Sequence, residues 1–309
     1  MRAIVIDKFG PPDVLELRDV PLPEPGPGDI RVAVFAAGIN PVEASTRADG
    51  TWAGMTLPAI LGSDFSGVVD AVGAGVEEWT VGDEVFGLAP FRGGGRGTYA
   101  EFHVIGAGAV VRKPQRLSHV EAAAMPLAGN TALSVRRRLN LQPGESVLVH
   151  GAGGGVGVFA VQLFAGTGVR VIALASSRHH TLLAELGVAA AFDYREVFSP
   201  DEEFDAVADF VGGATLAGSL PHLREGGRAA TIAGLEGDLD LAIDHNITLH
   251  GVLLDSRDTT LLEELAAEVE AGRLRPVVSA VFGLDEAADA HRRLEGGHVQ
   301  GKIVLEVRR

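Results

Sequence analysis

A long uncharged stretch near the middle of the chain constrains the fold more than any other feature. Residues 146–169 contain no Asp, Glu, Lys or Arg over 24 positions, a length that is enough on paper to cross a lipid bilayer. Seven of these residues are glycines, and five of the seven lie between Gly151 and Gly157, which a membrane-spanning helix would not favour. A buried strand, a glycine turn and a buried helix account for the stretch better, so we reject a membrane span.

This strand, turn and helix are typical of a dinucleotide-binding site. Glycines let the backbone approach a pyrophosphate, and the N–H groups at the start of the helix stabilise the anion together with the helix dipole. The strict G-x-G-x-x-G register is not met, and Ala152-x-Gly154-x-x-Gly157 is the nearest match. We expect the pyrophosphate to contact Gly153, Gly154, Gly155, Val156 and Gly157.

The next expected strand, residues 169–174, discriminates between the two nicotinamide cofactors. An NAD-specific site usually has an Asp or Glu about 20 residues after the glycines, which holds the ribose 2′-hydroxyl. Here the strand leads into Ser176, Ser177 and Arg178, with no carboxylate. Arg178 is a permanently charged donor that suits a 2′-phosphate, which His179 could share, so we expect NADPH rather than NADH. The alternative is an Arg178 that is simply solvated in the first turn of the next helix.

Two patterns divide the chain. The first 118 residues have short alternating strands between Gly- and Pro-rich turns, which is typical of a barrel or sandwich. From residue 119, a helical pattern over 120–139 is followed by alternating strand and helix signals, which predict a parallel sheet with helices on both faces. The tail has helical patterns over 259–271 and 284–294 and a closing strand over 302–307, and we expect it to pack on the first domain.

Composition excludes several classes of function. Lys and Arg number 26 against 41 Asp and Glu, and the resulting net charge of −15 opposes nucleic acids and anionic membranes. The chain has no cysteine, so it has no disulfide, no thiolate nucleophile and no Cys-based metal site. The apolar run within residues 1–8 is too short for a signal peptide, so we expect a cytoplasmic protein. Because of the negative net charge, we expect no membrane or nucleic-acid partner.

Several motifs occur in a specific order over nearly the whole chain. They are Gly38-Ile39-Asn40-Pro41-Val42-Glu43, Leu61-Gly62-Ser63-Asp64-Phe65-Ser66-Gly67, Gly97-Thr98-Tyr99-Ala100-Glu101, Thr131-Ala132, the glycine turn, Asp193-Tyr194-Arg195 and Gly301-Lys302-Ile303-Val304-Leu305. The ordered set resembles the zinc-free quinone oxidoreductase (zeta-crystallin-like) branch of the medium-chain dehydrogenase/reductase superfamily. The resemblance implies an α/β fold: a GroES-like catalytic domain over 1–118, completed by 255–309, a Rossmann NADP-binding domain over 119–254, and an active site in the cleft.

The resemblance also argues against catalytic zinc. In the zinc-dependent alcohol dehydrogenase branch, a cysteine ligand stands at the position of Asn40 and a histidine ligand at the position of Ser63. An amide and a hydroxyl cannot replace these ligands. Without a Lewis acid, conjugate reduction is easier than reduction of a simple ketone, because hydrogen-bond donors can stabilise an enolate-like oxygen.

Three residues are predicted to act in catalysis. The resemblance places Asn40 and Thr131 beside the nicotinamide, where they would orient the cofactor or contact the substrate oxygen. The alternatives are a turn role for Asn40 before proline, and a hydrogen bond within the helix for Thr131. Ser45 stands where the family often has a tyrosine, and would be a smaller, polar substitute that puts quinone as the natural substrate in doubt.

The resemblance adds further residues. Tyr194 is expected near the adenosine phosphate, with a plain surface position as the alternative, and Val211 and Gly234 complete the expected cofactor site. Asp64 and Lys302 are expected to be structural. The apolar strand at 247–254 would be an exposed sheet edge in a monomer, and the family pairs this strand across a two-fold axis, so we expect a homodimer.

The sequence therefore predicts an NADPH-dependent, zinc-independent oxidoreductase that transfers a hydride to a quinone or an α,β-unsaturated carbonyl compound. Two alternatives stay open. One is an enoyl-thioester reductase of the same superfamily. The other is an NADPH-binding sensor or structural protein with little turnover.

Overall fold

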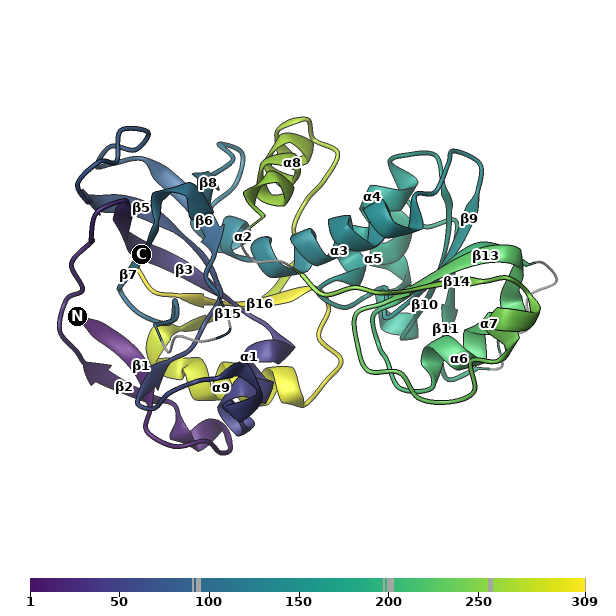
Figure 1. Cartoon of the computed structure of the whole chain (residues 1–309), viewed down its shortest axis with the longest axis horizontal. Helices are drawn as coiled ribbons and strands as arrows, with labels where there is room; N and C mark the ends of the chain where they lie inside the picture. The colour runs from purple at the N-terminus through teal and green to yellow at the C-terminus, as the bar shows by residue number, and fades with distance from the viewer. Residues whose placement is uncertain (91, 93–95, 197, 199–202, 255–257, 309) are drawn as a thin grey trace. The chain divides into compact units, whose positions relative to one another are not determined.

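The computed structural model describes all residues except 91, 93–95, 197, 199–202, 255–257 and 309, and its contacts divide the chain into two compact units (Figure 1). The first unit comprises Met1–Leu127, a segment that ends at Gly272 and a segment that begins at Pro276. The second comprises Ala128–Leu254 with Arg273–Arg275. The first boundary falls after Leu127 rather than after residue 118, because helix α2 (His119–Ala123) packs on strands of the first unit.

The first unit is built on two sheets. The smaller has the order β2 (Glu16–Asp19), β1 (Arg2–Ile6), β4 (Ala59–Ile60). The larger has the order β15 (Val278–Gly283), β16 (Lys302–Glu306), β3 (Asp29–Ile39), β5 (Asp64–Val72), β6 (Glu84–Leu88), β8 (Val110–Arg112), and β7 (Phe102–Gly106) also pairs with β3. Side chains of β3 alternate between buried and half-buried over most of its length, as expected for a strand with one face on a core.

The C-terminal segment belongs to the core of this unit. Strand β16 pairs antiparallel with β3, which brings Ile303 opposite Ile39. Helix α9 (Ala287–Glu295) contacts α1 (Pro41–Ala48), as Figure 1 shows. The buried Arg47 of α1 joins the two helices: its Nη2 donates to Glu295 Oε1 at 2.5 Å and its Nη1 lies 3.1 Å from His291 Nδ1. The C-terminal segment therefore fixes the position of α1. Helix α8 (Thr259–Glu270) also belongs to this unit.

The second unit is a parallel sheet covered by helices. Its strand order is β11 (Ala190–Asp193), β10 (Arg170–Ala175), β9 (Ser146–His150), β12 (Phe204–Asp209), β13 (Leu223–Thr231), β14 (Thr248–Gly251). From β9 the chain winds outward in one direction through α4 (Gly157–Ala165) and α5 (His180–Glu185), and from β12 in the other through α6 (Thr215–Ser219) and α7 (Leu241–Asp244). Right-handed crossovers place these two pairs of helices on opposite faces, as Figure 1 shows.

The direction of winding changes between β9 and β12. In open α/β sheets, ligands bind outside the carboxyl ends of the strands at such a point. The fold class predicted from the sequence, a β-rich domain and a parallel α/β domain, is confirmed.

Some predicted elements were wrong in detail. The helical pattern over 120–139 forms two helices, α2 and α3 (Pro126–Leu139), because Pro126 cannot continue a helix that began before it. The helical pattern over 284–294 starts with a 3₁₀ turn at Leu284–Glu286, and its α-helical part is α9. Among the described helices, none is both long and apolar enough to cross a membrane.

Candidate functional site

The glycine turn lies where β9 meets α4, at the carboxyl edge of the second unit's sheet. A Cβ atom at Gly153 would lie 2.0 Å from His179 Nδ1, so the imidazole packs directly on this α-carbon. A Cβ atom at Gly157 would lie 2.3 Å from the Gly151 carbonyl oxygen, so the helix begins in close contact with the turn. The N–H groups of Val158, Phe159 and Ala160 donate to the carbonyls of Gly154 and Val156. An anion at this end of the helix would therefore meet the N–H groups that precede them, in residues 155–157.

The residues predicted to select the cofactor follow β10. Ser176 is buried and Arg178 is exposed, and Arg178 Nε donates to Ser176 Oγ at 3.3 Å. Among the described residues, no carboxylate pairs with the Arg178 guanidinium, so its terminal nitrogens are free for a ligand.

A carboxylate that the sequence reasoning missed lies beside these residues. Asp193 ends β11 and accepts the N–H of Ser177 at 3.0 Å, but its charge is already paired. Arg195 Nη2 lies 2.5 Å from Asp193 Oδ2 and Arg195 Nε 2.8 Å from Oδ1, and these contacts lower the pKa of Asp193. Tyr194 is half exposed, and its ring contacts the Arg195 guanidinium. At this corner Arg195 pairs with Asp193, whereas Arg178 has no acidic partner among the described residues.

Two loops at the neighbouring strand ends are joined to each other. After β12, Asp209 Oδ1 accepts the N–H of Val211 at 2.9 Å and of Gly212 at 3.1 Å, which fixes the loop. Gly213 then donates to the carbonyl of Gly234 at 2.8 Å, so the loops that carry Val211 and Gly234 lie side by side. Val211 is 58 % exposed, and its Cγ2 would lie 3.1 Å from a Cβ atom at Gly151. The structure thus brings Val211 and Gly234 to the same sheet edge as the glycine turn.

The predicted catalytic residues fall in both units. Thr131 is buried in α3, within the second unit. Asn40 and Ser45 belong to the first unit, where Asn40 is the N-cap of α1 and Ser45 is exposed on the same helix. Ser45 therefore does not join the buried residues around Asn40.

Asn40 lies in a buried polar cluster. Its Nδ2 donates to Asp64 Oδ2 at 3.0 Å, and its Oδ1 accepts from Lys302 Nζ. Lys302 Nζ also donates to the carbonyl of Ile39 at 3.0 Å and lies 3.2 Å from Asp64 Oδ2. The backbone N–H of Leu127 donates to Asp64 Oδ1 at 2.7 Å. Lys302 thus has three acceptors for its three N–H groups, and the Asn40 amide is engaged at both ends.

The same cluster contains an acidic residue that the sequence reasoning missed. Glu43 is 3 % exposed, and its Oε2 accepts the N–H of Asn40 at 2.7 Å. Burial, and secondarily repulsion by Asp64, raises the pKa of Glu43 to about 7. The spacing Asn-x-x-Glu at the start of a helix is a capping-box pattern, and this signal could have identified Glu43.

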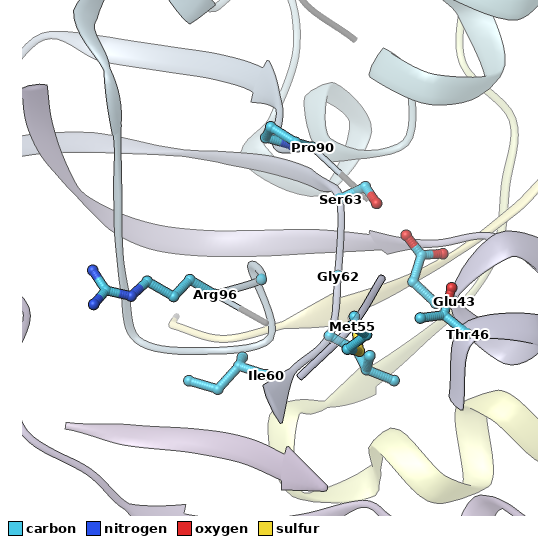
Figure 2. A pocket seen from close by; sticks show the side chains of 10 residues that line it. Glu43, Thr46, Met55, Ile60, Gly62, Ser63, Pro90 and Arg96 are labelled. Carbon is cyan, nitrogen blue, oxygen red and sulfur yellow. The ribbon is translucent and has the colours of Figure 1, made fainter. Parts of the chain in front are cut away.

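A small cavity adjoins this cluster in the first unit (Figure 2). Its volume is about 20 Å³, enough for one water molecule. Glu43, Thr46 and Ser63 supply polar groups to its wall, and the Ser63 hydroxyl has no hydrogen-bond partner among the residues that the structure describes. Figure 2 shows this hydroxyl and the Glu43 carboxyl group pointing toward one another.

The donor set of the cluster does not fit a zinc ion. Asn40 and Ser63 offer an amide and a hydroxyl, and the Lys302 ammonium already supplies the positive charge that Asp64 faces. Within the described part of the chain, no group of three or more His, Cys, Asp or Glu residues could hold a metal ion.

Comparisons with known proteins extend over both units. Residues 26–115 match the family model of the alcohol dehydrogenase GroES-like domain, and residues 186–305 match the model described as zinc-binding dehydrogenase. The quinone oxidoreductase of Sus scrofa is 31 % identical over 99 % of this chain and 97 % of its own length.

Solved structures agree with this assignment. The quinone oxidoreductase from Coxiella burnetii has a TM-score of 0.91 at 35 % identity, covering 100 % of this chain and 99 % of its own. A protein described as an NAD-dependent alcohol dehydrogenase has the same TM-score and identity, covering 99 % of this chain and 100 % of its own. The chain therefore belongs to the quinone oxidoreductase branch of the medium-chain dehydrogenase/reductase superfamily of oxidoreductases.

Proposed function

We propose that the protein is an NADPH-dependent oxidoreductase that reduces a quinone or an α,β-unsaturated carbonyl compound by hydride transfer. The observation that carries the proposal is the arrangement at the carboxyl edge of the second unit's sheet. There the glycine turn runs closely packed into the start of α4, and Arg178 stands beside Ser176 without a carboxylate partner among the described residues.

The residues present fit a nicotinamide dinucleotide. The start of α4 would hold the pyrophosphate, and Ser176 and Arg178 would hold the 2′-phosphate, with Tyr194 beside it. Val211 and Gly234, in the two joined loops, would contact the nicotinamide half. When bound, the cofactor supplies a hydride. The chain must orient it and must stabilise the negative charge that collects on the substrate oxygen, because the donor set around Asn40 does not fit zinc.

Cofactor binding tests the proposal most simply, because one solved relative is described as NAD-dependent. Titration of nicotinamide fluorescence should show tighter binding of NADPH than of NADH. Losing a charge-assisted contact costs about 1.5–3 kcal/mol, so Arg178→Ala should weaken NADPH binding roughly 10- to 100-fold and leave NADH unchanged. Arg170→Ala, at the opposite end of β10, is the matched control. Equal affinity for both cofactors, unaffected by Arg178→Ala, would refute the assignment.

Turnover distinguishes the proposal from its rivals. Oxidation of NADPH should be measured with quinones, enones and enoyl thioesters. Reduction of quinones or enones supports the proposal. Reduction of enoyl thioesters alone would replace it by an enoyl-thioester reductase. Tight NADPH binding with no turnover would indicate a binding protein.

We also propose that two copies pair through the edge of the second unit's sheet. Strand β14 ends the described strand order, and the neighbouring Leu253 is 71 % exposed. A strand edge of this kind, with an exposed apolar side chain beside it, invites pairing with a second copy. Sedimentation should show a dimer, which Thr248→Pro in the edge strand should weaken, and a monomer at micromolar concentration would contradict the proposal.

A further inference from the structure

Reduction by hydride transfer needs a proton as well as a hydride, and the first unit contains a buried group able to supply it. The Glu43 carboxyl group is almost fully buried at the wall of the cavity in Figure 2. Its Oε2 is taken by the N–H of Asn40 at 2.7 Å, whereas its Oε1 has only a marginal contact, 3.5 Å from Asn40 Nδ2. Oε1 is therefore the oxygen that can carry a proton.

The Ser63 hydroxyl stands on the same cavity wall. It is 1 % exposed and has no hydrogen-bond partner in the described part of the chain, which is costly for a buried hydroxyl. The hydroxyl of Thr46, which also lines the cavity, instead donates to the Val42 carbonyl at 2.7 Å. The Ser63 hydroxyl thus has no well-formed hydrogen bond, and it faces Glu43, close enough to lower the pKa of that carboxyl group.

We propose that Ser63 donates the proton that completes substrate reduction, and that Glu43 replaces that proton on Ser63. This inference rests on the proposed function. The cavity accommodates one water molecule or one carbonyl or quinone oxygen.

The substrate carbon gains the hydride, and the electron pair displaced from its double bond collects on the substrate oxygen. The Ser63 O–H bond breaks toward that oxygen while the Glu43 Oε1–H bond breaks toward Ser63 Oγ, and Glu43 is left as a carboxylate. A proton from solvent then restores Glu43. In free enzymes, hydrogen bonds used in catalysis are often long and tighten only when substrate binds, as this relay requires of Ser63 and Glu43.

The charges around Glu43 favour its protonated form at neutral pH. Burial has the largest effect and, together with repulsion by Asp64, raises the pKa of Glu43 to about 7. The Ser63 hydroxyl, the Lys302 ammonium and the Asn40 N–H act in the opposite direction and only partly offset this rise. Tyr99 also faces this cluster, and burial keeps its pKa well above the usual value, so its phenol stays neutral. Glu43 therefore exchanges its proton near neutral pH, which suits an acid that must be restored in every cycle.

Three variants test the relay. Glu43→Gln keeps an acceptor for the Asn40 N–H but has no acidic proton, Ser63→Ala removes the donor, and Ser63→Thr restores a hydroxyl. Thr167→Val is the matched control, because the Thr167 hydroxyl is likewise bound to a backbone carbonyl, that of Phe164, and does not line the cavity. We expect Glu43→Gln and Ser63→Ala to lower kcat roughly 10²-fold with little change in NADPH affinity, and Ser63→Thr to recover most of the loss.

Two readouts separate a proton relay from a structural role. The wild-type kcat should fall as pH rises above about 7, with a solvent deuterium isotope effect, and both features should vanish in Glu43→Gln but persist in Thr167→Val. In the protein without cofactor, infrared spectroscopy should show a protonated carboxyl band at pH 6 that is absent from Glu43→Gln and titrates near pH 7.

The outcomes distinguish the relay from the function on which it rests. If wild type reduces no acceptor, the proposed function fails. If wild type turns over but Glu43→Gln and Ser63→Ala keep its kcat and pH profile, the relay is wrong and the function stands. Absence of the infrared band from wild type at pH 6 would also overturn the relay.

Discussion

The buried ammonium of Lys302 should hold the first unit together, and Lys302→Met should show by how much. Lys302 Nζ has acceptors on Ile39, Asn40 and Asp64, and both charged side chains are at most 3 % exposed. Methionine fills a similar volume but leaves the Asp64 carboxylate buried without its cation. Breaking a buried pair on one side costs about 3–5 kcal/mol, so Lys302→Met should lower the free energy of unfolding by that amount.

The tryptophans make the measurement specific to one unit. Both of the chain's tryptophans, Trp52 and Trp79, lie in the first unit, so their fluorescence during urea unfolding reports on that unit. Lys113→Met is the matched control: Lys113 is also buried, but its carboxylate partner Glu84 is half exposed and stays hydrated when left alone. The free energy of unfolding should fall clearly less in Lys113→Met than in Lys302→Met.

A double-mutant cycle checks the cause. If the loss comes from an uncompensated Asp64 charge, Asp64→Asn in the Lys302→Met background should recover part of it, whereas Asp64→Asn alone should destabilise. A loss of less than about 1 kcal/mol in Lys302→Met would refute this reasoning. So would a double variant whose loss equals the sum of the losses of Lys302→Met and Asp64→Asn.

Three further predictions concern separate features. The pKa of Glu43 in the folded protein, about 7, exceeds its ordinary value of 4.5, so the folded state binds the extra proton and stability falls as pH rises through this window. In urea titrations, Glu43→Gln should remove about 2–3 kcal/mol of the decline in stability between pH 5 and 8, and an unchanged decline would contradict the assignment. Gly153→Ala should displace the His179 ring and weaken NADPH binding at least 10-fold. Gly218→Ala is the control, because no atom lies within 4 Å of the added methyl group; this variant should bind NADPH normally and gain about 0.5–1 kcal/mol in stability. Normal NADPH binding by Gly153→Ala would count against the turn as the phosphate site. Arg195→Ala should release the Asp193 carboxylate beside Ser177 and shift cofactor preference toward NADH, and an unaltered NADPH-to-NADH affinity ratio would show that Asp193 has no influence there.

The parts of the structure that follow from local pattern were predictable. The strand, turn and helix around the glycines need only a contiguous buried stretch, and the residues that follow β10 and β12 reach the same sheet edge because all strands of this sheet are parallel. Glu43 could also have been predicted from the sequence, because its spacing from Asn40 is that of a capping box at the start of a helix.

Contacts between distant parts of the chain were not predictable in this way. Lys302 lies 262 residues from Asn40, and Glu295 lies 248 residues from Arg47. Both contacts depend on the pairing of β16 with β3 and the packing of α9 on α1, which no local pattern encodes. The pairing of Asp193 with Arg195 is local, but the sequence did not reveal that this carboxylate folds back onto the Ser177 N–H.

The central claim is that NADPH is the hydride donor and that Arg178 selects it. The most direct measurement is kcat/KM for reduction of a quinone or enone with NADPH and with NADH, in wild type and in Arg178→Ala. We predict that wild type has the higher kcat/KM with NADPH. In Arg178→Ala, kcat/KM with NADPH should fall roughly 10-fold or more, whereas kcat/KM with NADH should stay unchanged. Equal use of both cofactors by wild type, or a preference for NADPH that survives in Arg178→Ala, would contradict it.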